Sequence, residues 1–403
     1  MSGSQASSGR GSQSPPPEDQ LQLSQAHKRL CLAITNNLLA CVSKRKRGRA
    51  KGRQRRKKVG DDEDSGYDKD EDVVAAYRSL ACWVPRAYDL FADMDQVFDL
   101  GIRADAASDI AEFERDLTPV ERRHLTTYRK IIVTKPSLSR LLSSPALLED
   151  EDGSGYEALV SLFTVGFNQG RCDDTKKLKK VGMEYAIPPG WPQCDTPDWG
   201  TGTKKSGRGF FNKMTARLLC PHEIVSDFDS DPNETMAALQ DGRIPVTSVS
   251  FPTFLYPFHH EYNQFNLREG LCRSEIIVKV YRHLFTGPAS ALEAGKRTTG
   301  PPPLAISHRL KHVTPRTLCY VICQIRVMLC SREAWNIQDG LFNLREFYDH
   351  LVALFEEKPG PNSSWTKTTL AWLDARVFQN IPEVAPLRTF TSDFDRLASE
   401  ADD

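Results

Sequence analysis

Cysteine, histidine and acidic side chains occur together in two short segments, and these are the residue types that hold Zn²⁺ in proteins. Cys220 stands two residues before His222, and His259, His260 and Glu261 form a run further along the chain. A zinc site also needs ligands at a characteristic spacing, such as paired CxxC motifs or the HExxH helix motif. Neither pattern occurs around these residues, so we predict no zinc site.

Side chains with carboxylate or amide oxygens occupy every second position from Asp227 to Asn233, as in the first half of a calcium-binding EF-hand loop. Such a loop requires glycine at its sixth position and glutamate at its twelfth, where this chain has Pro232 and Ala238. Calcium binding is therefore not expected, and Asp231 is better explained as the N-cap of a helix that begins at Pro232. We predict neither a metal nor another cofactor.

A glycine-rich basic loop from Gly200 to Gly209 offers three cations that could bind an anion: Lys204, Lys205 and Arg208. Backbone N–H groups in such a loop can also surround an anion. The loop lacks the GxxxxGK[ST] phosphate-binding pattern and the GxGxxG pattern. A solvated connection is the alternative interpretation of this segment.

Three cysteines share one helical face at spacings of four and seven: Cys319, Cys323 and Cys330. Their neighbours are apolar, which indicates a buried helix with unreactive thiols. The chain also lacks the GxSxG elbow of hydrolases and the signature motifs of kinases. No catalytic residue is assigned on these grounds.

An enzyme of unrecognised type is the alternative function, with its active site in the loop region 200–265. The acid and base candidates there are His259, His260 and Glu261, beside the Lys204 to Arg208 segment. Catalysis would require these groups to converge in a concave and partly dry site.

A strongly basic tract at residues 44–58 carries eleven lysines and arginines and no acid. The eleven cations are Lys44, Arg45, Lys46, Arg47, Arg49, Lys51, Arg53, Arg55, Arg56, Lys57 and Lys58. Two clusters joined by a short spacer are typical of a segment that a nuclear import receptor binds. The tract could also neutralise phosphates and so bind DNA or RNA without sequence preference. A solvated linker without any partner is the remaining alternative.

Composition limits what the rest of the chain can do. The 403 residues have a formal net charge of zero, and eight acids at 61–72 follow the basic tract, so nucleic-acid contact must come chiefly from the tract. The longest apolar run is far shorter than the roughly 18 residues of a membrane-spanning helix. The first residues lack the features of a secretory signal. We therefore expect no membrane partner, and a location in the nucleus, with the cytoplasm as the alternative.

The candidate residues must be positioned by helices, because helix patterns cover most of the sequence. Sustained alternation of apolar and polar residues, which is typical of strands, is absent from it, so we predict a mainly α fold. Capping residues and prolines mark helix starts at Thr118, Asp231, Thr314 and Asn343. Apolar spacing predicts further helices at 21–42, 73–99, 104–116, 155–181, 271–285 and 365–379. Proline- and aromatic-rich stretches at 187–209 and 244–265 are expected to be long loops.

These sequence patterns divide the chain into three regions. Residues 1–72 are expected to form a flexible arm with one amphipathic helix, the basic tract and the acidic block. Residues 73–380 form the helical domain, and residues 381–403 are expected to be a disordered tail.

Five segments of the helical domain form a recognisable set: KSGRGF from Lys205, LLCP from Leu218, FLY from Phe254, RSEIIVKVYRHLFTGPAS from Arg273, and Val313 to Trp335. Together they resemble a family of uncharacterised proteins from basidiomycete fungi. The resemblance covers roughly residues 75–357 and implies a fungal origin and an intact family domain. It implies no activity, substrate or catalytic residue.

Taken together, the sequence favours a nuclear, helical binding or scaffold protein over an enzyme. Its expected partners are a nuclear import receptor, proteins bound by the helical domain, and possible nucleic acid bound by the arm. The identity of those proteins does not follow from the residues.

Overall fold

A computed structural model describes most of the predicted helical domain: residues 29, 32–34, 67–144, 147, 154–188, 204–296 and 301–379. The basic tract and the predicted tail at 381–403 lie outside these residues, as does nearly all of the predicted helix at 21–42. The chain divides into two compact units, Met1–Arg171 and Cys172–Asp403, each described by itself below.

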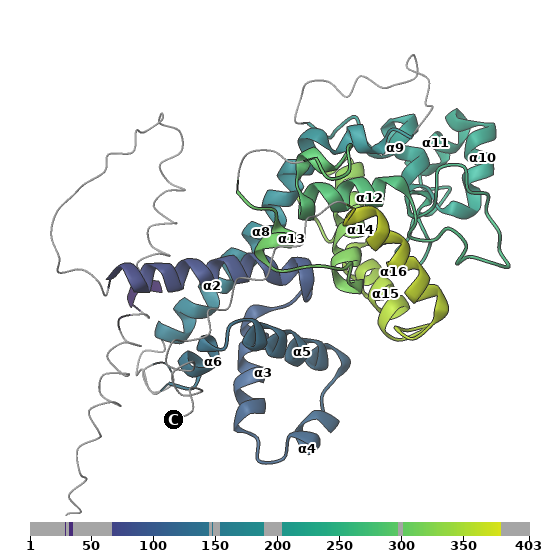
Figure 1. The fold of residues 1–403 in the computed structure, drawn as a ribbon. Helices are drawn as coiled ribbons and strands as arrows, with labels where there is room; N and C mark the ends of the chain where they lie inside the picture. The colour runs from purple at the N-terminus through teal and green to yellow at the C-terminus, as the bar shows by residue number, and fades with distance from the viewer. Residues whose placement is uncertain are drawn as a thin grey trace, which may run out of the picture. The chain divides into compact units, whose positions relative to one another are not determined.

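Helices form nearly all of the regular structure in the part of the chain that is described, which confirms the predicted mainly α fold (Figure 1). The helices of the first unit are α2 (Tyr67–Ala87), α3 (Met94–Ala106), α4 (Ile110–Arg115), α5 (Pro119–Thr134), α6 (Ser137–Leu142) and the first part of α8 (Ser154–Ala186). None of the described helices combines the length and the apolar character needed to span a membrane.

The predicted cap of α5 is present in the first unit. The Thr118 hydroxyl accepts a hydrogen bond from the backbone N–H of Glu121 at 3.2 Å, and the Glu121 carboxylate accepts one from the N–H of Thr118 at 2.8 Å. This reciprocal pair satisfies two backbone donors that a helix start otherwise leaves unpaired. It also lowers the pKa of Glu121, through the hydrogen bonds from Thr118.

Two helix boundaries differ from the prediction. The range 73–99 contains two helices, because the chain turns after Ala87 and Asp93 caps α3 by accepting from the N–H of Asp95 at 3.1 Å. The start of α2 lies earlier than predicted, at Tyr67, inside the acidic block.

Close helix packing in the first unit depends on glycine. The α3 and α5 helices lie side by side (Figure 1), and a Cβ atom at Gly101 would stand 2.2 Å from the ring of Tyr128. The α2 and α8 helices meet at Gly166 and Gly170, where a Cβ atom would stand 2.6 Å from the Cβ of Ala81 and 2.5 Å from the Cys82 carbonyl oxygen respectively.

The second unit has more and shorter elements. The helices before residue 300 are η2 (Gly209–Phe211), α9 (Lys213–Leu219), η3 (His222–Ile224), α10 (Val225–Ser230), α11 (Pro232–Gln240), η4 (Thr253–Leu255), α12 (Glu275–Tyr281), η5 (Arg282–Thr286) and η6 (Pro288–Ser290). Those after it are α13 (Leu304–Ser307), α14 (Pro315–Leu329), α15 (Leu344–Glu356) and α16 (Ser364–Val377). A two-stranded antiparallel hairpin, β1 (Gln338–Asp339) and β2 (Phe342–Asn343), precedes α15.

The α14 helix forms the core of the second unit, with α9, α12 and α15 packed against it. Thr314 caps its start as predicted, by accepting from the N–H of Thr317 at 3.2 Å. Cys319 and Cys323 are fully buried in it, and burial raises the pKa of both thiols well above the usual value. The prediction of a buried helix is confirmed at these two positions, and the low reactivity of the thiols stays a prediction.

The predicted cap at Asp231 is also present. Its carboxylate accepts from the backbone N–H of Glu234 at 3.1 Å and so starts α11, which ends before the left-handed Gly242 (φ +80°). The long loop at 244–265 contains a single short 3₁₀ turn, η4. Phe254 and Tyr256 from this loop are buried in the unit, as expected for aromatic side chains that hold a loop onto helices.

Candidate functional site

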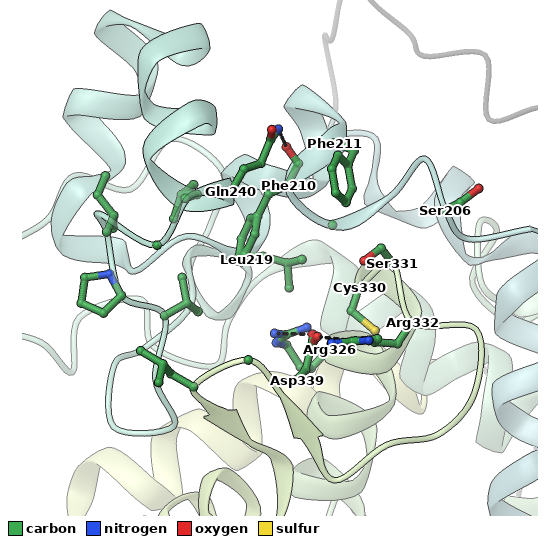
Figure 2. A pocket seen from close by; sticks show the side chains of 18 of the residues that line it. Ser206, Phe210, Phe211, Leu219, Gln240, Arg326, Cys330, Ser331, Arg332 and Asp339 are labelled. Atoms are coloured by element: carbon green, nitrogen blue, oxygen red, sulfur yellow. Dashed lines mark hydrogen bonds and ion pairs between the residues drawn. The ribbon is translucent and has the colours of Figure 1, made fainter.

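A pocket of about 820 Å³ opens in the second unit beside the C-terminal end of α14 (Figure 2). Its lining comes from three separate stretches of the chain, within 206–219, 239–246 and 326–341. A volume of this size lies within the range of roughly 300–1,000 Å³ that is common for ligand pockets. We call it the Arg326 pocket, after the arginine in its wall.

One wall of the Arg326 pocket is apolar. Phe210, Leu219, Leu239 and Ile244 line it. Leu239 belongs to a buried cluster with Ala216, Cys220 and Phe228, and Phe210 and Ile244 pack against that cluster. The backbone at Phe210 is held in place by Gln240, whose side-chain amide donates to the Phe210 carbonyl at 2.7 Å (Figure 2). This wall is therefore supported by packed side chains behind it and offers a preformed apolar surface.

The opposite wall carries a buried guanidinium. Arg326 lies in the last turn of α14, is 4% exposed, and donates one hydrogen bond to the Asp339 carboxylate at 3.1 Å (Figure 2). Its guanidinium also lies 4.4 Å from the ring centroid of Phe342. The Nε–H of Arg326 is buried and has no partner among the described residues.

Asp339 links two arginines across this wall, because its other oxygen accepts from the Nε–H of Arg332 at 3.1 Å. The ion pairs balance most of the local positive charge, so the pocket does not present an unpaired cation.

Two large apolar side chains stand at the rim of the pocket. Phe211 is 62% exposed at the end of η2, and Leu341 is 67% exposed at the turn between β1 and β2. Gly340 adopts φ +63° in that turn, a left-handed conformation that glycine adopts without strain. An exposed apolar rim beside an apolar pocket is typical of a surface that binds another molecule.

Two of the three cations of the predicted anion-binding loop, Lys205 and Arg208, are buried in the structure. Lys205 is 1% exposed, and its ammonium group donates to the backbone carbonyls of Val327 and Arg332 at the end of α14, within 3.4 Å of the Cys330 sulfur. Burial lowers the pKa of Lys205. Its donors are used on one carbonyl in the last turn of α14 and one just beyond the helix, where a cation also interacts favourably with the helix dipole.

Arg208 acts in the same way. It is 5% exposed and donates to the carbonyls of Met328 at 2.9 Å and Lys179 at 2.7 Å, and burial lowers its pKa. Lys204 is the exposed cation of the predicted set. Anion binding by the loop stays a prediction, and Lys205 and Arg208 would have to leave their carbonyl partners to take part in it.

The predicted ligand types around Cys220 are only partly brought together. The Nε2 of His222 lies 3.1 Å from the Nδ1 of His260, and its ring stacks on Tyr256 at 4.0 Å. Burial, followed by the charges of His260 and Arg217, lowers the pKa of His222 to about 4, so it is neutral at pH 7. Burial raises the pKa of Cys220 to about 12. Within the described ranges, no group of three or more His, Cys, Asp and Glu side chains is arranged to hold a metal ion.

The residues of the enzyme hypothesis have separate surroundings. His259 and Glu261 are exposed, and His259 lines a second cavity beside Arg217. Lys205 and Arg208 are instead occupied at the end of α14. The structure therefore does not gather these acid, base and anion-binding candidates into one concave site.

The sequence patterns did not identify Arg326 or Asp339. An arginine near the end of an apolar helix was the available signal, because a cation within such a run must find an acceptor when the helix is buried. Asp339 lies in a two-residue strand with no regular sequence pattern. The eleven cations of the basic tract lie outside the described residues.

A sequence profile of the family of unknown function DUF6698 matches residues 165–378, which is more than half of the chain. This range includes every described residue that lines the Arg326 pocket. It also bears out the prediction of an uncharacterised family domain. Neither a curated protein nor a solved structure matches the chain. On the extent of the profile match, the chain belongs to the family of unknown function DUF6698.

Proposed function

We propose that the helical domain binds a segment of a partner protein in the Arg326 pocket. The observation that carries this proposal is the pair of exposed rim residues, Phe211 and Leu341, beside an open apolar pocket. Burying such side chains against a partner removes apolar surface from water and contributes about 25 cal/mol for each Å². A peptide segment would place an apolar side chain against Phe210 and Leu219.

The balanced charge of the opposite wall supports an uncharged peptide segment as the occupant. Asp339 pairs with both Arg326 and Arg332, so the wall offers no unpaired cation to an acidic ligand. The domain would then bind an apolar side chain within an uncharged stretch of the partner.

The enzyme alternative has less support at this site. The described lining includes the hydroxyls of Ser206 and Ser331 and the thiol of Cys330, but no histidine. The Cys330 thiol donates to the Val327 carbonyl at 3.2 Å and is 6% exposed. A nucleophile normally needs a free base within hydrogen-bond reach. The amine of Lys205 is near this thiol, but it already donates to the Val327 and Arg332 carbonyls, so binding is the function that we favour.

Peptide selection with the full protein tests the proposal. We expect a displayed library of random short peptides to yield binders with an apolar residue in common. Changing Phe211 or Leu341 to aspartate is expected to weaken these binders about tenfold or more, because a charge would enter the buried part of the interface. Affinities measured by fluorescence anisotropy give the comparison.

Phe265→Asp is the matched control, since Phe265 is 89% exposed and is not part of the pocket lining. It should leave the selected peptides bound as tightly as the wild type binds them. Equal loss in Phe265→Asp and Phe211→Asp, or binders unaffected by both pocket variants, would refute the pocket as the binding site.

For the arm, we propose that the basic tract at 44–58 directs the protein to the nucleus and contacts nucleic acid through phosphates. Support comes from its eleven cations without any acid. Replacing all eleven by glutamine is preferable to removing residues 1–72, because α2 already begins at Tyr67. We expect the variant to lose its nuclear accumulation and its affinity for random DNA and RNA.

The salt dependence of nucleic-acid binding separates the two roles of the tract. Each phosphate contact contributes about 0.9 to the slope of log affinity against log salt for duplex DNA. A steep slope in the wild type that is lost in the glutamine variant supports contact with nucleic acid. Unchanged location and unchanged binding in the variant would refute both roles and favour a solvated linker.

The source of the chain is a further part of this proposal. The RHLFTGPAS segment that ends at Ser290 resembles proteins of basidiomycete fungi, and we propose such a fungus as the source. A search of genomes tests this proposal. Finding the segment as often in unrelated organisms as in basidiomycetes would contradict it.

A further inference from the structure

A basic surface surrounds the C-terminal end of α16, away from the pocket of the proposed function. Two neighbouring parts of the second unit reach this end of the helix. Arg282 of η5 donates to the Arg376 carbonyl at 2.9 Å, and the Asp374 carboxylate accepts from the backbone N–H of Val313 at 2.5 Å. We call the surface formed by the cations of these parts the exit surface: Lys279, Arg282, Arg309, Lys311 and Arg376.

The cations of the exit surface outnumber the acids beside them. The elements that carry them are α12, η5, α16 and the segment 304–313, and their acids are Glu275 and Asp374. Asp374 is occupied by His312 and by the Val313 N–H. None of the five cations forms an ion pair with a described residue. Five cations and two acids, with the histidines neutral, leave a net charge of +3.

Two of these cations are partly removed from water. Burial lowers the pKa of Lys279 and of Arg282, and the charge of Arg376 also lowers that of Arg282, while Glu275 acts in the opposite direction on both. Lys279 donates to the Ile187 carbonyl at 3.4 Å, and Arg282 to the Arg376 carbonyl. Carbonyl groups satisfy these donors but do not balance their charge, so a negative group brought to the surface would stabilise the cations.

The chain itself supplies negative charge at this point. Residues 380–403 continue from the end of α16 and lie outside the described residues. They contain six acids and two arginines, which gives a net charge of −4. A segment joined to its binding surface by a short connection has an effective concentration on the order of millimolar, so even a weak attraction is sufficient to hold it.

Two other charged segments could compete for this pairing. The acidic block at 61–72 could bind the exit surface, and the basic tract at 44–58 could bind residues 380–403. Both belong to the first unit of the chain, whereas residues 380–403 begin at the exit surface itself. From this position and the opposite charges, we infer that residues 380–403 bind the exit surface of the same molecule. An acidic partner then has to displace them to reach it.

Carbodiimide crosslinking of the full protein tests this inference. The reagent joins a carboxylate to a lysine amine where the two are in contact, and mass spectrometry of the peptides identifies the pairs. We expect Lys311 to couple to the carboxylates of residues 380–403 about tenfold more than Lys204 does. Lys204 is equally a cation at an exposed position, but it stands beside Lys205 at the other end of α14 from Val313.

Arg309→Glu should lower the coupling at Lys311 about fivefold, because it reverses an exposed charge two residues away and leaves the lysine in place. Lys213→Glu is the matched control, since it makes the same change of charge at an exposed position at the start of α9. It should leave the coupling at Lys311 unchanged.

Equal coupling at Lys311 and Lys204, or unchanged coupling at Lys311 in Arg309→Glu, would overturn the inference. Coupling that falls on dilution would assign the bound segment to a second copy of the chain, and coupling chiefly to residues 44–58 or 61–72 would assign the contact to a competing segment. Either outcome also overturns it. Because Phe211→Asp alters the Arg326 pocket and no residue of the exit surface, failure of the peptide proposal leaves this test unaffected.

Discussion

Replacing Lys205 with alanine is expected to destabilise the second unit by about 3 kcal/mol, although lysine usually tolerates substitution well. The ammonium group of Lys205 is buried and donates to the Val327 and Arg332 carbonyls at the end of α14. Alanine would leave these carbonyls without their donor and would leave a space where the long side chain had packed. Both effects act on the helix that forms the core of the unit.

Hydrogen exchange measured by mass spectrometry gives the most direct test. A loss of about 3 kcal/mol corresponds to an increase in exchange rate of roughly two powers of ten for amides of α14 that open with the unit. Lys204→Ala is the control, because it removes the same side chain one residue earlier at an exposed position. If Lys204→Ala and Lys205→Ala give the same exchange rates, the carbonyl contacts of Lys205 contribute nothing to stability.

Local features of the sequence predicted much of the fold. Helix starts at Thr118, Asp231 and Thr314 were predictable because a cap and its backbone partner are only three residues apart. The buried α14 helix was predictable because apolar residues surround Cys319 and Cys323. In each case the information lies within a few turns of the element that it determines.

The polar contacts of the site could not be predicted in the same way. Lys205 and Arg208 occupy a glycine-rich segment that is typical of a solvated loop, while their partners lie about 120 residues later in the chain. The Arg326 and Asp339 pair joins a helix to a short hairpin with no regular pattern. Such contacts depend on how elements pack, and the burial of a charge becomes visible only once that packing is known.

Glycines at helix contacts are a further feature that the sequence alone left without a role. Gly166 and Gly170 are spaced four residues apart on α8, so they lie on the same face of the helix. The structure places α2 against that face, with the Cys82 carbonyl closest to Gly170. This contact predicts the second large effect, in the first unit of the chain.

Gly170→Ala is expected to destabilise the first unit by about 2 kcal/mol, even though alanine favours an exposed helix by about 1 kcal/mol over glycine. The added Cβ would stand 2.5 Å from the Cys82 carbonyl oxygen, which belongs to the backbone of α2 and cannot rotate away. The helices would have to separate, which would also disturb the hydrogen bonds of Arg86 to the Cys82 and Gly170 carbonyls, at 2.7 and 3.1 Å.

Asn168→Ala provides the control for Gly170→Ala, since Asn168 is exposed on the same turn of α8. The helix propensity that alanine gains there offsets the loss of the exposed hydrogen bond that Arg171 donates to Asn168 at 2.6 Å. Exchange rates of α2 amides should rise by more than a power of ten in Gly170→Ala and should stay near the wild type in Asn168→Ala. A stability gain in both variants would mean that intrinsic helix propensity outweighs the contact, and that α2 and α8 do not need glycine where they meet. The different results expected for two alanines two residues apart therefore distinguish packing from propensity.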